Sequence, residues 1–99
     1  MTTTTIPRPD VLPSELLRRG WCQGETMRET APGMRQYCLF GAWTDVMASY
    51  DTPEWLEVRT VLVGVTGNAS QIMWNDTRGR TQAEVVAVSE EAERRLGWQ

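Results

Sequence analysis

The stretch Trp74-Asn75-Asp76-Thr77-Arg78-Gly79-Arg80-Thr81 decides how the chain folds more than any other segment. It opens with a large aromatic residue, passes through polar residues and a glycine, and ends where a helix begins. Thr81 and Glu84 form a T-x-x-E capping box, in which each side chain accepts a hydrogen bond from the other residue's backbone N–H. Asp76 and Gly79 stand where a type I turn prefers its first and last residues. The stretch therefore predicts a turn leading directly into a helix.

Composition predicts one soluble domain with an aromatic core. A chain of 99 residues can bury a core without a metal ion or a disulfide. Its five tryptophans supply much of that core, since each can bury about 150–250 Å². The net charge is −3, and the ten basic residues are all scattered arginines. This pattern lacks the basic patch of a nucleic-acid-binding protein, so we expect no nucleic-acid partner.

The cysteines and the apolar runs indicate a cytoplasmic protein. Cys22 and Cys38 are the only cysteines, and residues 1–5 lack the charged and apolar regions of a secretory signal. The apolar runs are far shorter than a membrane span, so we expect no membrane partner. Two reduced thiols are the favoured state, with a disulfide between them as the weaker alternative.

Helix start signals and apolar spacing predict four helices. Their expected ranges are 11–19, 35–49, 53–65 and 81–96. The first would begin at Asp10 as N-cap and stop at Gly20 in a left-handed conformation. The second carries apolar residues at helical spacing, and its Gly41 would let another element approach closely.

The third helix has the strongest start signal, but the residues in its middle have a lower preference for the helical conformation. Asp51, Pro53 and Glu54 supply a capping residue, a proline in the first turn and a capping-box partner. Residues 60–65 are rich in β-branched residues, so a strand competes with the helix there.

The other segments lack clear helix or strand signals. Residues 1–9 are polar and broken by two prolines, which predicts a flexible N-terminal arm. Residues 22–34 fit either a loop or a short, weak hairpin. The expected fold class is mostly α: residues 10–99 form a single helical domain, a compact bundle of about four helices with at most one minor β-hairpin.

Missing residue types exclude several kinds of chemistry. The chain has no histidine, which removes Ser-His-Asp and Cys-His catalysis and any zinc site that needs imidazole. Two cysteines cannot form a four-cysteine zinc site, and neither a P-loop nor a G-x-G-x-x-G motif is present. We therefore expect no catalytic residues, no metal and no cofactor, and favour a protein that is not an enzyme.

Two arrangements could still carry chemistry. Cys38 near a helix start could be a nucleophile, but a small buried side chain between Tyr37 and Leu39 is favoured. Asp76 and Glu84 could act as an acid–base pair. The favoured alternative assigns Glu84 to the capping box and Asp76 to the turn.

Six residues are candidates for binding a ligand or partner. Arg78 and Arg80 could bind an anion at the last helix's N-terminus, unless Thr81 caps those amides and Arg80 pairs with Asp76. Trp98 could be an exposed docking residue, although packing near Ala92 is favoured. The full set of candidates is Trp74, Asn75, Asp76, Arg78, Arg80 and Trp98.

Three segments, read in order, resemble a known family. They are Gly20-Trp21-Cys22-Gln23-Gly24, Tyr37-Cys38-Leu39-Phe40-Gly41-Ala42, and Trp74-Asn75-Asp76 with Gly79-Arg80-Thr81 and Glu84-Val85. Together they resemble a domain-of-unknown-function family of actinobacteria and their phages, over residues 15–96. The segment between Gly24 and Tyr37 is shorter than the family's usual one, and Pro13 stands where a longer helix is usual. The resemblance implies an actinobacterial or phage source and brings no activity with it.

Three functions fit these observations. The favoured one is a small non-catalytic module that binds another protein, such as a phage product acting on a host factor. The second is a small enzyme or anion-binding protein that uses Cys38, Asn75, Asp76 and Arg80. The third is a virion component or another self-assembling protein, which would be a homo-oligomer. Whether those four side chains face an open cleft or lie inside the fold separates the first two.

Overall fold

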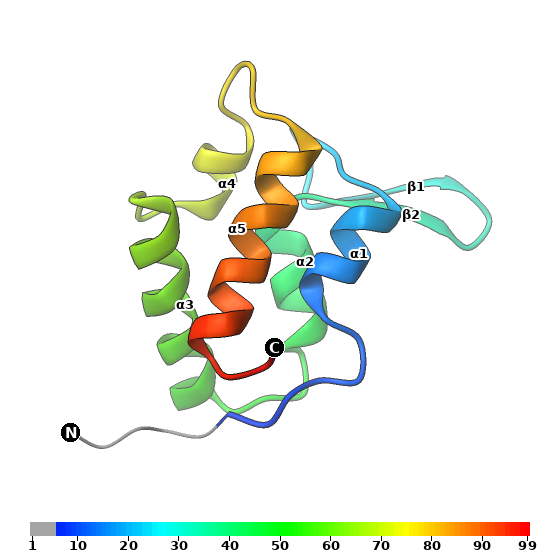
Figure 1. Ribbon diagram of the computed structural model, residues 1–99. Helices are drawn as coiled ribbons and strands as arrows, with labels where there is room; N and C mark the ends of the chain where they lie inside the picture. The colour runs from blue at the N-terminus through cyan, green and yellow to red at the C-terminus, as the bar shows by residue number, and fades with distance from the viewer. Residues whose placement is uncertain (1–5) are drawn as a thin grey trace.

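Four helices surround the core, a short fifth helix closes one side, and a β-hairpin projects from the helical body (Figure 1). The computed structural model describes residues 6–99. Its elements are α1 Pro13–Arg19, β1 Met27–Ala31, β2 Met34–Tyr37, α2 Leu39–Val46, α3 Thr52–Thr66, α4 Gln71–Asn75 and α5 Gln82–Arg95. The expected fold class, mostly α with a minor hairpin, is confirmed.

The core is centred on Trp43 of α2. This side chain is fully buried and stacks on Trp98, with ring centroids 5.5 Å apart. Its indole N–H donates to Ser89 Oγ of α5 at 3.1 Å. Val58 and Leu62 of α3 are also fully buried in this cluster. Burying such large apolar side chains is the main favourable contribution to folding.

Both predicted capping boxes are present. The Thr81 hydroxyl accepts from the Glu84 backbone N–H, and Glu84 accepts from the Thr81 N–H at 3.0 Å. At the start of α3, the Asp51 N–H donates to Glu54 Oε1 at 2.9 Å. These local signals outweigh the β-branched residues of α3, which is helical throughout its 15 residues.

The start of α1 differs from the prediction that Asp10 caps it. Leu12 is the N-cap and offers no side-chain bond, so α1 begins at Pro13. A residue 79 positions away supplies the missing acceptor: Glu93 Oε2 accepts from the Ser14 backbone N–H at 2.8 Å, and Oε1 accepts from the Ser14 hydroxyl at 2.8 Å. A carboxylate at a helix N-terminus is favoured by the helix dipole. The cap therefore comes from α5.

The second helix is shorter than the predicted range 35–49. Residues 34–37 pair with β1 instead, with Arg28 opposite Gln36 and Met27 opposite Tyr37. The helix begins after Cys38, whose Sγ accepts from the Gly41 N–H at 3.2 Å. Residues 27–37 thus form the hairpin that the sequence left open as an alternative to a loop.

Two glycines allow the hairpin to approach the helices. A Cβ at Gly41 would lie 1.8 Å from the Thr26 carbonyl oxygen, which confirms the predicted close approach. Gly20 is extended rather than left-handed, so the predicted left-handed stop is wrong. A Cβ there would lie 2.5 Å from the Arg35 carbonyl oxygen. Gly20 is therefore explained by close backbone packing, not by a positive φ.

The sequence did not predict α4, and it placed the following turn one residue too early. Ser70 caps this short helix by accepting from the Met73 N–H at 3.2 Å. The turn bond runs from the Arg80 N–H to the Thr77 carbonyl oxygen, and Gly79 has a φ of 86°. A positive φ at the third turn residue is the feature of a type II turn, not of the predicted type I turn.

Both ends of the described chain are held against the core. The C-terminus of α5 forms a Schellman motif: the Gly97 N–H donates to Arg94 O, and the Trp98 N–H to Glu93 O. The Trp98 indole N–H donates to Ile6 O at 3.0 Å, and the Ile6 side chain is buried. Residues 6–9 of the expected arm are thus docked on the fold, whereas residues 1–5 of it lie outside the described residues.

Replacing the buried Glu93 tests the cap that α5 supplies to α1. We expect Glu93→Gln to lower the free energy of unfolding by about 1–3 kcal/mol, because its amide N–H₂ would face buried donors. Glu90→Gln on the same helix is the matched control and should cost only about 0–1 kcal/mol, since it loses an exposed ion pair with Arg18. Urea unfolding followed by circular dichroism measures both, and equal losses would contradict the assigned role.

Candidate functional site

The three sequence segments that carry the family resemblance meet at Asn75, the last residue of α4. Asn75 is fully buried. Its Oδ1 accepts from the Trp21 indole N–H at 2.7 Å and from the Leu39 backbone N–H at 3.0 Å. Its Nδ2 donates to the Cys22 carbonyl oxygen at 3.0 Å. One side chain therefore joins the segment after α1, the start of α2 and the end of α4.

Asp76 and Gln23 extend this network to the surface. Asp76 Oδ1 accepts from Asn75 Nδ2 and from the Gly24 backbone N–H, each at 3.0 Å. Gln23 Nε2 donates to the Asn75 carbonyl oxygen at 2.9 Å. We call the set Trp21, Gln23, Gly24, Leu39, Asn75 and Asp76 the Asn75 clasp.

Arg80 is engaged beside the clasp, but not by its predicted partner. Its guanidinium lies over the Trp74 ring, 3.9 Å from the centroid, and its Nε donates to the Trp74 carbonyl oxygen at 3.1 Å. Its ion pair is with Glu84 at 3.2 Å, so the expected pair with Asp76 is wrong. Hydrogen bonds from Thr81 and from Arg80 lower the pKa of Glu84, which keeps this capping carboxylate ionised.

The candidate residues thus divide by exposure. Trp74, Asn75 and Trp98 are buried, and Asp76 is bonded to the clasp. Arg78 is exposed, and within residues 6–99 it has neither a hydrogen bond nor an ion pair. The N-terminus of α5 is capped by Thr81, whose hydroxyl accepts from the Glu84 N–H, so that amide is not available to an anion. The structure does not bring these residues together in an open cleft.

The two thiols are also enclosed. Cys22 and Cys38 are free and almost fully buried. Burial raises the pKa of each thiol above its ordinary value, and at Cys38 the bond from the Gly41 N–H offsets this only in part. The arrangement favours the buried structural side chain over the nucleophile. Within residues 6–99, no group of three or more acidic or cysteine side chains is placed to hold a metal ion.

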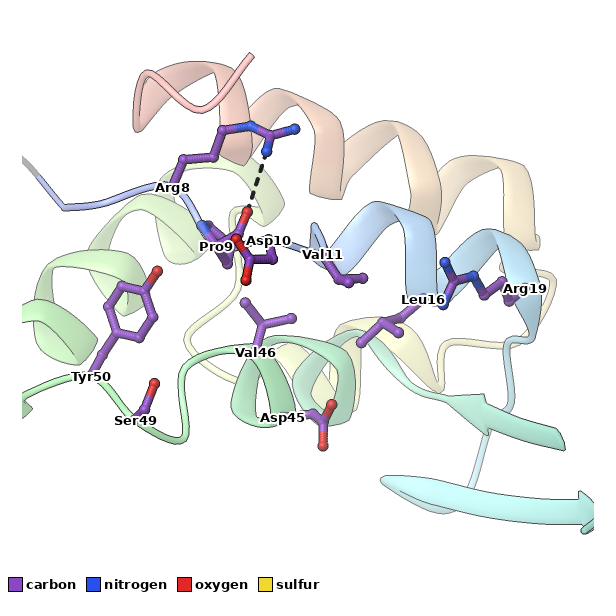
Figure 2. Close-up of a pocket in the computed structure, with 10 residues that line it drawn as sticks. All are labelled: Arg8, Pro9, Asp10, Val11, Leu16, Arg19, Asp45, Val46, Ser49 and Tyr50. Atoms are coloured by element: carbon purple, nitrogen blue, oxygen red, sulfur yellow. Dashed lines mark hydrogen bonds between the residues drawn. The ribbon is translucent and has the colours of Figure 1, made fainter. Parts of the chain in front are cut away.

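The open surface lies on another face, between the N-terminal segment, α1 and the end of α2. Figure 2 shows this groove with the ten residues that line it, from Tyr50 and Ser49 at one end to Arg19 at the other. It encloses about 470 Å³. Arg8 crosses one end, held by the carbonyl oxygens of Pro9 and Trp98. We call it the α1–α2 groove.

A second hollow adjoins the groove at Leu16 and Arg19, which line both. It lies between α1 and the hairpin and encloses about 330 Å³. Its other walls are Gly33, Met34, Arg35 and Tyr37. We call it the hairpin hollow. Together the groove and the hollow provide a continuous open surface along α1, and of the motif residues Tyr37 alone lines it.

Sequence reasoning missed this surface. The apolar face of the first predicted helix included Leu16, but no pattern showed that its neighbours would leave that side chain partly open. The hairpin forms one wall, and its position depends on contacts between distant segments. No sequence signal marks this surface, because the exposure of Met34, which is 60%, is known only once the fold is formed.

Comparison with known proteins places the chain in a family. Residues 14–95 match the model of a family of unknown function, DUF6197. The chain belongs to this family. The DUF6197 match begins at Ser14 and ends at Arg95, so it spans α1 to α5 and includes the whole Asn75 clasp. The family description assigns no activity or ligand.

Other comparisons add nothing to the DUF6197 assignment. No curated protein and no solved structure is significantly similar to the chain. Among residues 6–99, each helix is too short or too polar to cross a membrane. The function must therefore be argued from the surface itself.

Three substitutions test whether the stretch from Trp74 to Thr81 is structural. Trp74→Ala should cost about 3–5 kcal/mol of unfolding free energy, because it empties a buried site. Asp76→Ala should cost about 1–3 kcal/mol through the lost bonds to Gly24 and Asn75. Arg78→Ala should leave the melting temperature unchanged. If the first two variants melt like wild type while a binding activity disappears, this stretch is a binding site instead.

The buried thiols predict a pH dependence of stability. Both thiols have a raised pKa in the folded protein, so they stabilise the fold below the pH at which a free thiol ionises, about 8.5. The free energy of unfolding should therefore fall as the pH rises above about 8.5, and less steeply in Cys38→Ala. Native Cys38 should resist iodoacetamide until denaturant is added. Rapid labelling of Cys38 in the native protein would restore the nucleophile hypothesis.

Proposed function

We propose that this chain is a small non-catalytic module that binds another protein, and that the α1–α2 groove and the hairpin hollow form its binding surface. The observation that carries the proposal is the separation of the two regions. The polar side chains of the motifs bond to one another and to the backbone, buried at Asn75 and exposed at Gln23 and Asp76, whereas none of them lines the α1–α2 groove. A groove without converging catalytic groups suits binding better than chemistry.

The shape and chemistry of the surface support a protein ligand. Leu16 and Val46 provide apolar contacts, and charged side chains stand at the rim, including Arg19 and Asp45. Specific protein interfaces combine an apolar centre with a polar rim in this way. An extended segment could follow the groove from Tyr50 to the hairpin. The hydroxyl of Tyr50 is already bound to the Pro7 carbonyl oxygen at 2.6 Å, which fixes that end.

The competing functions have weaker support. The enzyme or anion-binding hypothesis needs Cys38, Asn75, Asp76 and Arg80 around a cleft, whereas Cys38 and Asn75 are buried and Arg80 is bound to Trp74 and Glu84. The self-assembly hypothesis needs a symmetric interface. We place the protein in the cytoplasm, or in the host cytoplasm if a phage encodes it.

Affinity capture with matched surface variants tests this proposal. Val11 lines the groove and is 36% exposed, so Val11→Arg should block the groove without emptying the core. Leu56→Arg on α3 is the control, because Leu56 is 54% exposed and lies outside both hollows. Tagged wild type and variants are incubated with actinobacterial lysate, and bound proteins are identified by mass spectrometry after circular dichroism confirms folding.

We expect Leu56→Arg to retain a partner that Val11→Arg loses at least tenfold. The proposal is wrong if no protein is enriched over the bare tag, or if Val11→Arg retains every partner of wild type. Loss of the partner in Arg78→Glu alone would move the binding site to the turn before α5.

A further inference from the structure

The lining of the hairpin hollow carries positive charge and no negative charge. Two of its lining residues are arginines, Arg19 and Arg35, and its lining contains no carboxylate. The other walls, Leu16, Met34 and Tyr37, are largely apolar, with Gly33 at the turn. An apolar floor beside two guanidinium groups matches a ligand that carries an apolar side chain next to negative charge.

The nearby acidic groups do not neutralise both arginines. Glu29 on β1 approaches Arg35, but its Oε2 lies 4.0 Å from Arg35 Nε and both side chains are about half exposed. Asp45 lies in the adjoining α1–α2 groove, and it and the Tyr37 side chain also interact with the Arg35 guanidinium. Arg19 is exposed and has no ion pair within residues 6–99, unlike its neighbour Arg18, which pairs with Glu90 at 2.6 Å. Arg19 therefore remains available to a ligand.

The hairpin turn brings the apolar part of the hollow into position. Gly33 has a φ of 77°, which lets the strands reverse tightly after Pro32 and projects Met34 toward α1. Met34 is 60% exposed, although a methionine gains more from an apolar contact than from water. A flexible methionine at the rim can adapt to the side chain of a partner.

We propose that the hairpin hollow binds a peptide segment in which an apolar side chain is flanked by aspartate or glutamate. The apolar side chain occupies the space between Leu16, Met34 and Tyr37, and the flanking carboxylates pair with Arg19 and Arg35. Arginine can bind a carboxylate through two parallel hydrogen bonds, so the contact is specific in geometry as well as in charge. This inference rests on the proposed function and specifies the partner's chemistry.

Synthetic peptides provide the test. Fluorescein-labelled dodecapeptides carry a central leucine, methionine or tryptophan flanked by aspartate and glutamate. The comparison peptides have lysine or serine in place of the acidic residues. Affinity is measured by fluorescence anisotropy at two salt concentrations, and the site is mapped from amide and arginine side-chain shifts in ¹H–¹⁵N spectra.

Two double variants separate the hollow from the overall charge of the protein. Arg19→Glu with Arg35→Glu reverses both arginines of the hollow. Arg59→Glu with Arg78→Glu makes the same change of net charge at two exposed arginines elsewhere. We expect acidic peptides to lose at least tenfold in affinity for the first variant and less than twofold for the second. Met34→Ser should weaken binding severalfold, because it removes one apolar wall.

Several outcomes would overturn the inference. They are equal binding by lysine peptides, equal loss in the two double variants, spectral shifts away from the hollow, and no saturable binding of acidic peptides. Capture from lysate separates this failure from failure of the proposed function. A partner that Arg19→Glu with Arg35→Glu retains and Val11→Arg loses would leave the groove as the binding surface and refute acidic recognition.

Discussion

The side-chain amide of Asn75 is the contact on which the arrangement of the hairpin, α2 and α4 depends. Its oxygen accepts two hydrogen bonds and its nitrogen donates two, so every polar position of the amide is occupied. Aspartate has the same shape but no donor, and leucine has neither donor nor acceptor. The partners come from Trp21, Cys22, Leu39 and Asp76. Because a buried unpaired polar group is costly, the site admits only one arrangement of these segments.

The parts of the fold that the sequence predicted correctly depend on neighbouring residues. The capping box of Thr81 and Glu84 spans three positions, and α5 begins where it indicates. The start of α1 was mispredicted because its acceptor is Glu93, and no local pattern connects Ser14 with a residue 79 positions away. The hairpin could not be distinguished from a loop for the same reason, since Gly20 and Gly41, which allow its close approach to the helices, lie outside it.

The candidate site follows the same division. The sequence motifs singled out Asn75 and Asp76 as candidate binding residues. A pattern of residue types, however, does not distinguish a side chain bonded within the fold from one that faces a ligand. Burial distinguishes them, and it depends on the whole chain. The α1–α2 groove and the hairpin hollow could not be predicted, because Leu16, Val46 and Tyr37 line them only after three elements have packed together.

The bond between Ser14 and Glu93 also has a consequence for the order of events during synthesis. Because α1 precedes α5 in the chain, it lacks an acceptor for its N-terminal amide until α5 has been translated. A contact that closes so long a loop forms late, because the chain loses conformational entropy on closing the loop before the contact contributes any stabilising energy. The helix α1 is therefore translated before α5 but completed only after it. Until then the side of α1 that packs on α5 has no partner helix.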